Sequence, residues 1–411
     1  MKRHFISILL FAIFTLAPLE AQEELGYQVP KKALLDMVDI DLAPAVLSNS
    51  DNSILVMLYR PTYKSIKTLS RKELRIAGLR VDPQRFIGSR STYYNKVTLV
   101  DLSQGKTPQA IQGLPDNPQL SNFNWSPDEK RIAMTHTSDT GVELWILDLA
   151  TKTAKPLVKD AINATMGNSI TWLKDSKGLL VKFIPKDREA LIDQTTIVPS
   201  GPKITENNGE KAQNRTYQDL IKNPTDAKNF TQLSRSELRR VDLDGKQTSF
   251  LETRMYGSVR LSPDGNFVLV DFVKPPCSYL VPYYRFPEET HVYNLKGEIV
   301  KIIDDAPLEE VRPKGFMAVA KGKRYISWRK DQPASLYYVE ALDEGDPEVD
   351  VPYRDALFQW AAPFDRAPTL LTKLKNRYAG VIWGNTATAI VYDSWWNNRN
   401  AKTYYFNPSK P

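Results

Sequence analysis

Short apolar runs separated by tight polar turns recur along most of the chain. The clearest copy begins at Trp125, passes through the turn residues Ser126-Pro127-Asp128, and continues into apolar runs at residues 131–134 and 143–149. Proline and aspartate favour tight turns, and short runs rich in apolar and β-branched residues favour strands. The pattern therefore predicts a strand, a turn, a buried second strand, and a third strand that ends near Thr151-Lys152.

Five weaker copies of this turn precede their own apolar runs, and they are centred on Asp51, Asp175, Asp264, Asp331 and Trp383. A second strand pair follows most copies, with turns such as Gln104-Gly105, Asp244-Gly245 and Lys296-Gly297. Six units of mostly four strands predict an all-β fold, a β-propeller of about six or seven blades or an incomplete ring. Most intervals exceed the roughly 40–50 residues of a blade, so helical or irregular insertions are expected between strands.

The first insertion runs from about residue 62 to 95 and is strongly basic. Within it we expect a short amphipathic helix over residues 69–79. The simplest interpretation is a solvated basic helix that covers the propeller rim. An alternative is an electrostatic collar that draws acidic peptides inward. We expect no nucleic-acid binding, because no motif for it accompanies the charge. Only Glu73 and Asp82 oppose its basic residues, which are Lys64, Lys67, Arg71, Lys72, Arg75, Arg80, Arg85 and Arg90.

The second insertion, from about residue 185 to 235, is polar and contains the run Val198-Pro199-Ser200-Gly201-Pro202-Lys203. We expect it to end in a helical stretch over residues 216–222. A surface excursion is favoured over a substrate gate, because long loops without their own core lie on protein surfaces.

Residues 1–21 have the layout of a secretory signal peptide. A positive start at Lys2, Arg3 and His4 precedes the apolar run 5–16, and a short stretch then leads to Ala21. The run is too short to cross a bilayer core of about 30 Å. We therefore expect cleavage near Ala21, a propeller domain over residues 22–411, no stable membrane anchor after cleavage, and a periplasmic or secreted bacterial product.

Composition narrows the chemistry that the 411 residues can perform. The single cysteine, Cys277, excludes an internal disulfide and any multi-cysteine metal site. We expect it to be a packed, unreactive thiol. Three histidines occur, and His4 falls in the signal peptide. His136 is expected in a surface turn, and His291 at the start of an outer strand.

No sequence motif for catalysis or cofactor binding is present. The run at residues 167–171 is nearest to a serine nucleophile elbow, but it lacks the second glycine. Residues 242–245 superficially resemble a calcium loop, yet the later ligands are absent and a hairpin turn is favoured. Phosphate-loop, dinucleotide and H-E-x-x-H motifs do not occur. We therefore expect no cofactor, no metal site and no catalytic residue in this chain.

Seven segments between about Tyr27 and Pro408 nevertheless match the sequence motifs of one family. The three motifs in the insertions are the most specific of them. The segments are residues 27–36, 73–83, 125–128, 198–204, 215–220, 281–287 and 326–329. They resemble glutamyl endopeptidase, a branch of the prolyl oligopeptidase superfamily of serine peptidases. The resemblance implies an N-terminal propeller that restricts access by peptides and a C-terminal α/β-hydrolase domain that supplies Ser, Asp and His. It also implies cleavage after acidic residues, chiefly glutamate.

The chain ends at Lys410-Pro411, before any hydrolase domain. We therefore expect a substrate-gating propeller that is truncated or split from its catalytic domain and inactive by itself. Its partners would be a separately encoded α/β-hydrolase domain and peptides with acidic residues. Arg215 and Arg285 match family motifs and are candidates to contact an acidic side chain. The alternatives are a non-enzymatic exported propeller that acts as a binding or scaffold protein, and an incomplete ring that does not fold stably.

Overall fold

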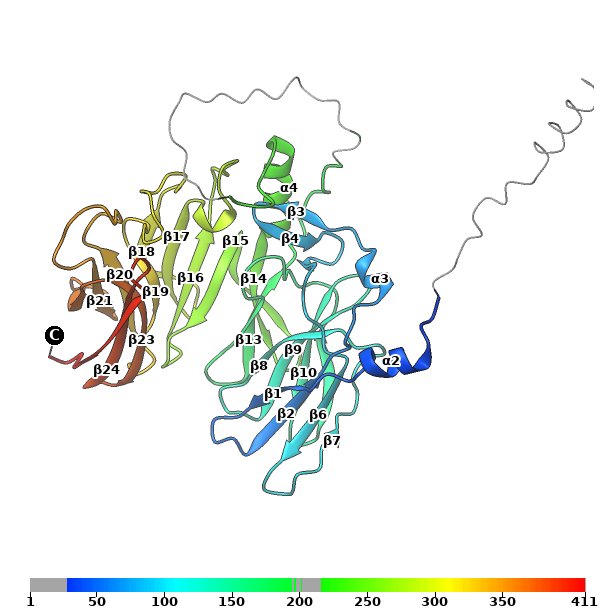
Figure 1. Cartoon of the computed structure of the whole chain (residues 1–411). Helices are drawn as coiled ribbons and strands as arrows, with labels where there is room; N and C mark the ends of the chain where they lie inside the picture. Colours follow the sequence, from blue (N-terminus) through cyan, green and yellow to red (C-terminus); the bar gives the residue numbers. More distant parts are fainter. Residues whose placement is uncertain (1–27, 194–195, 197–200, 202–215, 411) are drawn as a thin grey trace, which may run out of the picture. The chain divides into compact units, whose positions relative to one another are not determined.

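A computed structural model describes residues 28–193, 196, 201 and 216–410 of the chain (Figure 1). The chain divides into two compact units, Met1–Ala43 and Pro44–Pro411. The described part of the first unit carries one helix, α2 (Lys32–Val38), which buries none of its residues. The predicted signal peptide at residues 1–21 lies outside the described residues. No described helix is long and apolar enough to cross a membrane.

The second unit consists of antiparallel sheets whose strands pair in chain order. We call the first four-stranded sheet blade 1; it contains β1 (Ala45–Ser48), β2 (Ile54–Tyr59), β6 (Lys96–Asp101) and β7 (Gln109–Ala110). Blade 2 contains β8 (Leu120–Trp125), β9 (Arg131–Thr137), β10 (Val142–Asp148) and β11 (Thr153–Val158).

The next sheet has seven strands and comprises two blades that share one strand. Its strands are β12 (Ile170–Trp172), β13 (Gly178–Phe183), β14 (Ser236–Asp242), β15 (Gln247–Leu261), β16 (Phe267–Val273), β17 (Glu288–Asn294) and β18 (Ile299–Ala306). The first half of β15 pairs with β14, and its second half pairs with β16. The outer strand of blade 3 therefore continues directly into the inner strand of blade 4.

Two further blades follow in the second unit. Blade 5 contains β19 (Arg324–Trp328), β20 (Ser335–Ala341), β21 (Asp355–Ala361) and β22 (Thr369–Leu374). Blade 6 has three strands, β23 (Arg377–Asn385), β24 (Thr388–Trp395) and β25 (Asn400–Phe406). The described residues thus form six successive meanders, which confirms the predicted all-β, propeller-type fold.

Each aspartate turn predicted from the sequence joins the first and second strands of a blade. In blade 2, Ser126 Oγ donates to Asp128 Oδ1 at 2.6 Å, and the same carboxylate oxygen accepts from Lys130 N–H at 3.2 Å. In blade 4, Asp264 Oδ1 likewise accepts from Asn266 N–H at 3.1 Å. A carboxylate that binds the main chain two residues on stabilises a tight turn, which explains why the motif recurs.

The core consists of apolar side chains packed between neighbouring blades. One cluster joins Val56 and Leu99 of blade 1 to Met134 and Leu147 of blade 2. Alternating residues of a strand face opposite sides of its sheet, so the apolar alternation seen in the sequence places these side chains on one face. Burying each large aliphatic side chain contributes about 1.5–3 kcal/mol. Interblade packing is therefore the main source of stability.

The helix predicted for residues 69–79 is wrong. The segment between β2 and β6 contains a one-turn helix, α3 (Ile66–Leu69), and a small sheet of β3 (Leu74–Ile76), β4 (Leu79–Asp82) and β5 (Ile87–Gly88). Ala77 and Gly78, at φ 52° and 83°, form the two-residue turn between β3 and β4. Two successive positive φ values suit a tight hairpin, and apolar residues alternate with arginines on both strands, which is a strand pattern.

The helix predicted for residues 216–222 is also wrong, because those residues form no helix. The helix of the second insertion is α4 (Pro224–Ser234), and it buries Phe230 and Leu233. The Asn223 side chain accepts a hydrogen bond from Asp226 N–H at 2.8 Å, and Pro224 occupies the first helical position. An asparagine cap followed by proline is a strong start signal, and it lies directly after the predicted segment.

Candidate functional site

Three long connections between strands lie at the same edge of their blades. They link the second and third strands of blades 1, 3 and 4, between β2 and β6, β13 and β14, and β16 and β17. In antiparallel blades these connections lie at the edge opposite to the aspartate turns. Figure 1 shows β3, β4 and α4 gathered at this edge. We call the described parts of the three connections the insertion cluster.

Main-chain hydrogen bonds join the three connections. Gly78 N–H donates to the carbonyl oxygen of Asp219 at 2.8 Å, and Tyr283 N–H donates to that of Ala77 at 2.9 Å. Arg80 Nε also donates to the Asp219 carboxylate at 2.6 Å. A Cβ atom on Gly78 would lie 2.6 Å from Pro282 Cβ, so only glycine fits this approach. The hairpin turn therefore locks the first connection onto the other two.

The insertion cluster has its own apolar core. Ile76 comes from the first connection, Ile221 and Phe230 from the second, and Val281 and Phe286 from the third. Phe230 and Phe286 meet edge to face, with ring centroids 5.7 Å apart. Three of the segments that carry the family resemblance are thus brought together in space, although they lie far apart in the sequence.

Arg285 lies at the centre of the insertion cluster, and its side chain is only 1% exposed. Its Nη1 donates to the Tyr217 hydroxyl, and its Nε lies 3.4 Å from Glu309 Oε2. Its carbonyl oxygen accepts from Glu309 N–H at 3.0 Å. The Glu309 carboxylate in turn accepts from Arg312 Nε at 2.5 Å. Arg285 therefore links the third connection to the second and to the segment after β18.

The two predicted substrate-contact arginines have different outcomes. Arg215 lies outside the described residues. Arg285 is buried, and its Nη2 atom donates to no acceptor among the described residues. A substrate carboxylate would need the surrounding loops to move before it could reach this guanidinium. Substrate contact by either arginine stays a prediction.

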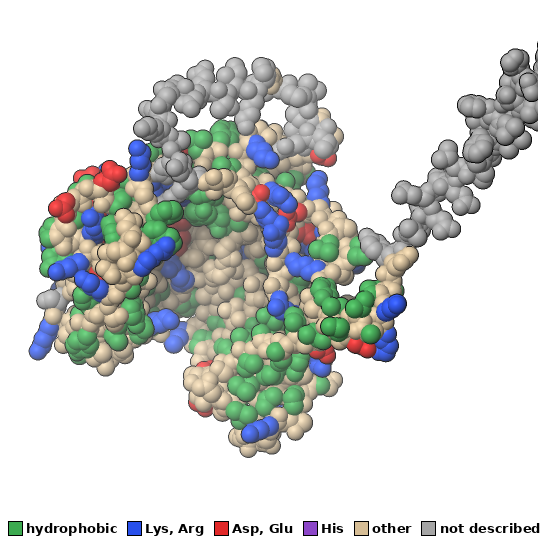
Figure 2. Space-filling model, viewed as in Figure 1, with side chains coloured by type: hydrophobic (Ala, Val, Ile, Leu, Met, Phe, Trp, Pro, Cys, Tyr) green, Lys and Arg blue, Asp and Glu red, His purple; other side chains and the backbone are tan. Residues whose placement is uncertain are grey.

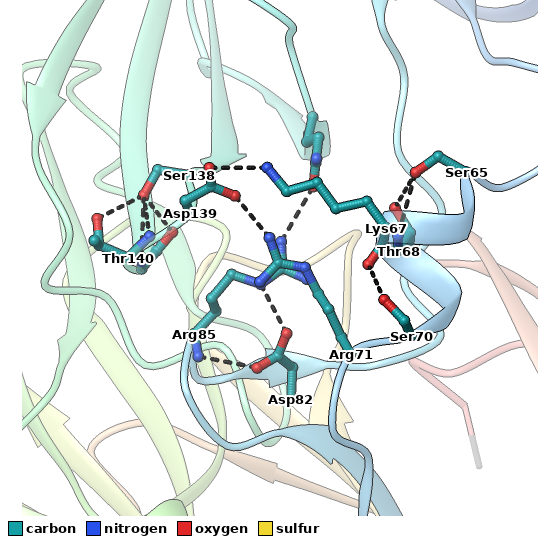
Figure 3. A network of polar contacts seen from close by, with 12 residues as sticks. Ser65, Lys67, Thr68, Ser70, Arg71, Asp82, Arg85, Ser138, Asp139 and Thr140 are labelled. Carbon is teal, nitrogen blue, oxygen red and sulfur yellow. Dashed lines mark hydrogen bonds and ion pairs between the residues drawn. The ribbon is translucent and has the colours of Figure 1, made fainter.

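Most of the basic residues in the first insertion are paired with acids. Figure 3 shows Lys67 and Arg71 on either side of Asp139, at 3.1 and 2.7 Å, and Arg85 against Asp82 at 2.7 Å. Asp139 belongs to the turn between β9 and β10, outside the insertion. Because acids from other elements neutralise much of this charge, the long-range attraction expected of an electrostatic collar is reduced.

Of the other basic residues in the insertion, two arginines are paired with an acid and two lysines are not. Arg75 and Arg90 both approach Glu73, and the Ser89 hydroxyl together with these cations lowers the pKa of the Glu73 carboxyl to about 2. Lys64 and Lys72 form no ion pair with any described residue.

Lys72 lines a pocket of about 360 Å³ between the first and second insertions. Lys222, which is likewise exposed and without an ion pair among described residues, lines the same pocket. Three acidic residues, Glu73, Asp193 and Asp226, also line it, so the pocket carries no large excess of positive charge.

The predicted positions of the two histidines are wrong. His136 is buried in β9, where Nδ1 lies 3.0 Å from the carboxylate of Glu143 on the neighbouring strand β10. His291 is buried in the middle of β17, with Nδ1 3.2 Å from the Tyr293 hydroxyl and Nε2 3.1 Å from Glu289. Burial lowers the pKa of the His291 imidazole. Both polar rings are tolerated inside blades because side chains on the same sheet supply their partners.

The turn at residues 242–245 is a hairpin, as predicted, and Cys277 is partly packed. Residues 242–245 form the hairpin turn between β14 and β15, with Gly245 N–H donating to the Asp242 carbonyl oxygen at 2.9 Å. Cys277 is partly buried, and this burial raises the pKa of its thiol.

Sequence reasoning missed the partners that hold the insertion cluster together. Tyr217 and Asp219 lie inside a segment that carries the family resemblance, so their presence in that motif was the available signal. Glu309 and Asp139 lie in connections with no distinctive pattern, and only the fold brings them to Arg285 and Arg71.

Comparison with known proteins adds a direct relationship. A protein of Oryza sativa subsp. japonica named probable glutamyl endopeptidase, chloroplastic, is 33% identical over 401 residues, which cover 94% of this chain and 42% of that protein. The protein of the same name from Arabidopsis thaliana is 32% identical over 396 residues, which cover 93% of this chain and 41% of its own length. The chain thus spans about two fifths of these relatives. No family model matches it.

Solved structures resemble the chain only distantly. An acylaminoacyl peptidase of Pyrococcus horikoshii has a TM-score of 0.44 at 12% identity, covering 90% of this chain and 45% of its own. A putative TolB of Agrobacterium tumefaciens has a TM-score of 0.34 at 10% identity, covering 89% of this chain and 90% of its own. Both scores lie below 0.5, and neither carries an argument about function.

Proposed function

Since this chain is homologous to glutamyl endopeptidases along almost all of its length, we propose that it is the substrate-gating propeller of a serine peptidase. Its role would be to admit short or unfolded peptides and to exclude folded proteins from catalytic residues supplied by an α/β-hydrolase part. The observation that carries the proposal is the 33% identity over 94% of the chain. This match spans both the blades and the insertions, which separates the chain from propellers that share only blade turns.

The packing of the second unit supports a gating role. A filter must keep its shape when a folded protein presses against it, and packed interblade faces provide that stiffness. The Trp172 Nε1 atom donates to the Asn124 carbonyl oxygen at 3.0 Å, which ties blade 3 to blade 2. Trp328 Nε1 donates to the Arg260 carbonyl oxygen at 3.0 Å and ties blade 5 to blade 4 in the same way.

Peptides with acidic residues are the proposed ligands of the insertion cluster. Lys72 and Lys222 are the cations best placed to meet them, because both line the same pocket, both are exposed and neither has an ion pair among the described residues. A lysine already bound to an acid of its own chain has less to gain from a second carboxylate.

The proposal is tested by reconstitution. The part of the rice relative that this chain does not match is produced separately and mixed with the full chain. Cleavage of a short glutamate-containing peptide and of a folded protein is then compared with and without the chain. We expect the mixture to cleave the peptide and spare the folded protein. If the chain neither binds the hydrolase part nor changes its substrate range, the gating function is wrong, and a free-standing binding or scaffold protein becomes the better account.

Export is a separate part of the proposal and rests on residues 1–21 alone. We propose that the signal sequence directs the chain to the periplasm or outside the cell. N-terminal sequencing of the protein from a fractionated bacterial host tests this. A mature N-terminus near Gln22 in the periplasmic fraction is expected, whereas an intact N-terminus in the cytoplasm would contradict export.

A further inference from the structure

The inner edges of three consecutive blades line one pocket. β8 and β12 are the first strands of blades 2 and 3, and each pairs with one other strand of its sheet. Beyond this pairing, β8 makes an isolated bridge at its first residue, Leu120, to Tyr94. The second half of β15 is the corresponding strand of blade 4. A pocket of about 320 Å³ lies against these three strands. Figure 2 shows a hollow in the second unit whose floor consists mainly of backbone and uncharged polar side chains.

Five of the ten residues that line this inner-edge pocket carry a carboxamide or hydroxyl group. Its lining includes Asn122 and Asn124 of β8 and, from blade 3, Asn168, Ser169 and Thr171. Asn168 and Thr171 are already engaged, since Asn168 Nδ2 donates to the Thr171 hydroxyl at 2.7 Å and to the Val259 carbonyl oxygen at 3.0 Å. Ser169 is buried and so is not open to a ligand. The groups with remaining capacity are therefore those of Asn122 and Asn124.

Each of these two asparagines uses only part of its side chain. Asn122 Nδ2 donates to the Thr135 hydroxyl at 3.0 Å, and Asn124 Nδ2 donates to the Asn122 carbonyl oxygen at 2.9 Å. Both side-chain oxygens accept no hydrogen bond from the described residues, and each amide nitrogen keeps a second N–H. Both residues are exposed. Each thus offers one donor and one acceptor to a ligand.

A bulge in β8 sets the direction of Asn122. The register of β8 against β9 shifts between Ser121 and Asn124, and Asn122 takes a φ of 52°. Asparagine tolerates this left-handed conformation better than most residues. Bulges re-aim side chains and recur next to binding sites. The two carboxamides are therefore held by the strand and by their own hydrogen bonds.

The pocket has little net charge to attract an ion. Arg260 is its only charged lining residue among those described. Its Nη2 donates to Asp271 at 2.7 Å, and its Nη1 donates to the Ile326 carbonyl oxygen at 2.9 Å. A guanidinium already paired in this way has little attraction left for a free carboxylate.

We propose that Asn122 and Asn124 bind the main chain of an extended peptide in this inner-edge pocket. A carboxamide carries the same donor and acceptor as a peptide group, so each asparagine matches one peptide unit of a passing chain. Recognition of the main chain depends little on sequence, which suits a filter that admits many peptides. This inference rests on the proposed gating function and names the part of a substrate that the pocket recognises.

An oligosaccharide is the competing kind of ligand, and the pocket suits it less well. Sugars bind proteins by stacking on exposed aromatic faces as well as by hydrogen bonds. Trp172 lines the pocket but is only 7% exposed, and its Nε1 is occupied by the Asn124 carbonyl oxygen. Trp125 is the other aromatic residue of the lining and is half-buried, so neither ring presents a fully open face to a sugar.

Calorimetric titration of the full chain tests the inference. The probe is an uncharged peptide of alternating alanine and serine with both ends blocked, and a copy methylated on its main-chain nitrogens lacks the N–H donors. Asn124→Ala removes one carboxamide, and Asn122→Gly removes the other while keeping the left-handed backbone. Asn95→Ala, at an exposed asparagine outside the pocket, is the matched control.

We expect each pocket substitution to weaken binding of the peptide about tenfold, because each removes one or two hydrogen bonds. Main-chain methylation should weaken binding to the unsubstituted chain at least as much, and Asn95→Ala should have no effect. Unchanged affinity in both pocket variants, binding of the methylated copy equal to that of the parent, or binding of soluble oligosaccharides instead of peptides would each overturn the inference. The gating function would survive those results, because reconstitution with the hydrolase part tests it independently.

Discussion

The Tyr217 hydroxyl accepts a hydrogen bond from the guanidinium of Arg285, across 68 positions in the sequence. This contact joins the second of the three connections to the third. A directional hydrogen bond fixes the orientation of the two connections more strictly than the apolar contacts between them. Arg285 therefore adds a direct link between these connections, beside the hydrogen bond that each makes to the Ala77-Gly78 turn.

Replacing Arg285 tests whether it positions the insertion cluster. Arg285→Ala leaves the Glu309 carboxylate with only Arg312 as its cation and opens a cavity, so we expect a loss of about 2–4 kcal/mol in the free energy of unfolding. Urea denaturation measures it. Arg240→Ala removes a partly exposed ion pair with Asp242 and should cost under about 1 kcal/mol. Unchanged stability in Arg285→Ala together with lost affinity for acidic peptides would instead identify Arg285 as a ligand contact.

Gly78 should tolerate no side chain. Its φ is 83°, and a Cβ would lie 2.6 Å from Pro282 Cβ. Gly322 has nearly the same φ, 80°, but a Cβ there would meet nothing within 4 Å, so Gly322→Ala measures backbone strain alone. We expect Gly78→Ala to lose about 1–3 kcal/mol more than Gly322→Ala in urea denaturation. Equal losses would mean that the contact with Pro282 is not needed.

The buried lysine of blade 3 should make stability depend on pH in the alkaline range. Lys182 Nζ is enclosed with the carbonyl oxygens of Met166 and Tyr256, and burial lowers its pKa to about 7. Between about pH 7 and the unfolded pKa of 10.5, the unfolded chain binds more protons. Stability therefore rises with pH over that window, by up to about 1.4 kcal/mol per pH unit.

Lys182→Met removes this dependence. We expect the variant to be more stable than the parent below about pH 7, with the gain fading as the pH approaches 10.5. Chemical denaturation at a series of pH values gives the result. The exposed Lys177→Met is the control and should leave the profile unchanged. If stability changed with pH in Lys182→Met as it does in the parent protein, the pKa of Lys182 would not differ between the folded and unfolded chains.

Glu288 should produce the opposite slope at lower pH. Burial, and then the neighbouring Asp271 carboxylate, raise the pKa of Glu288 to about 7. Between about 4.5 and 7 the folded chain binds more protons than the unfolded chain, so stability falls as the pH rises. Glu288→Gln should be neutral below about pH 4.5 and stabilising by about 3 kcal/mol above pH 7. Glu348→Gln, at an exposed position, should match the parent at every pH.

Lys72 and Lys222, which line one pocket and have no ion pair among the described residues, should control affinity for acidic peptides. Lys72→Ala combined with Lys222→Ala is expected to raise the dissociation constant for a glutamate-rich peptide about tenfold at low salt, with the difference shrinking at high salt. Fluorescence anisotropy with a labelled peptide measures this. Lys67→Ala is the control, because that lysine is already paired with Asp139. Equal effects of the control and the double variant would point to general charge attraction.

The sequence was most informative where a local physical cause sets the structure. The Asp128 turn could be predicted because its hydrogen bonds reach only two residues along the chain. The β3–β4 hairpin was harder to predict, because the spacing of Leu74, Ala77 and Gly78 also fits a helical period, although Ala77 and Gly78 form the turn. His136 was placed at the surface because its partner, Glu143, lies on the next strand and only pairing reveals it.

The insertion cluster shows the same limit at longer range. Its segments could be identified from the family resemblance, but nothing local predicts that Gly78 meets Asp219 or that Arg285 meets Glu309. Those contacts follow from blades 1, 3 and 4 directing their connections to one edge, which is a property of the assembled fold.

The uninterrupted strand β15 gives the molecule a mechanical asymmetry. Blades 3 and 4 share its main chain, since residues up to Arg254 pair with β14 and residues from Met255 pair with β16. The junctions of blade 2 with blade 3 and of blade 4 with blade 5 carry instead a tryptophan-to-carbonyl hydrogen bond beside packed side chains. We expect relative motion of the blades to occur at those junctions before it occurs along β15, so that the middle pair of blades moves as one body.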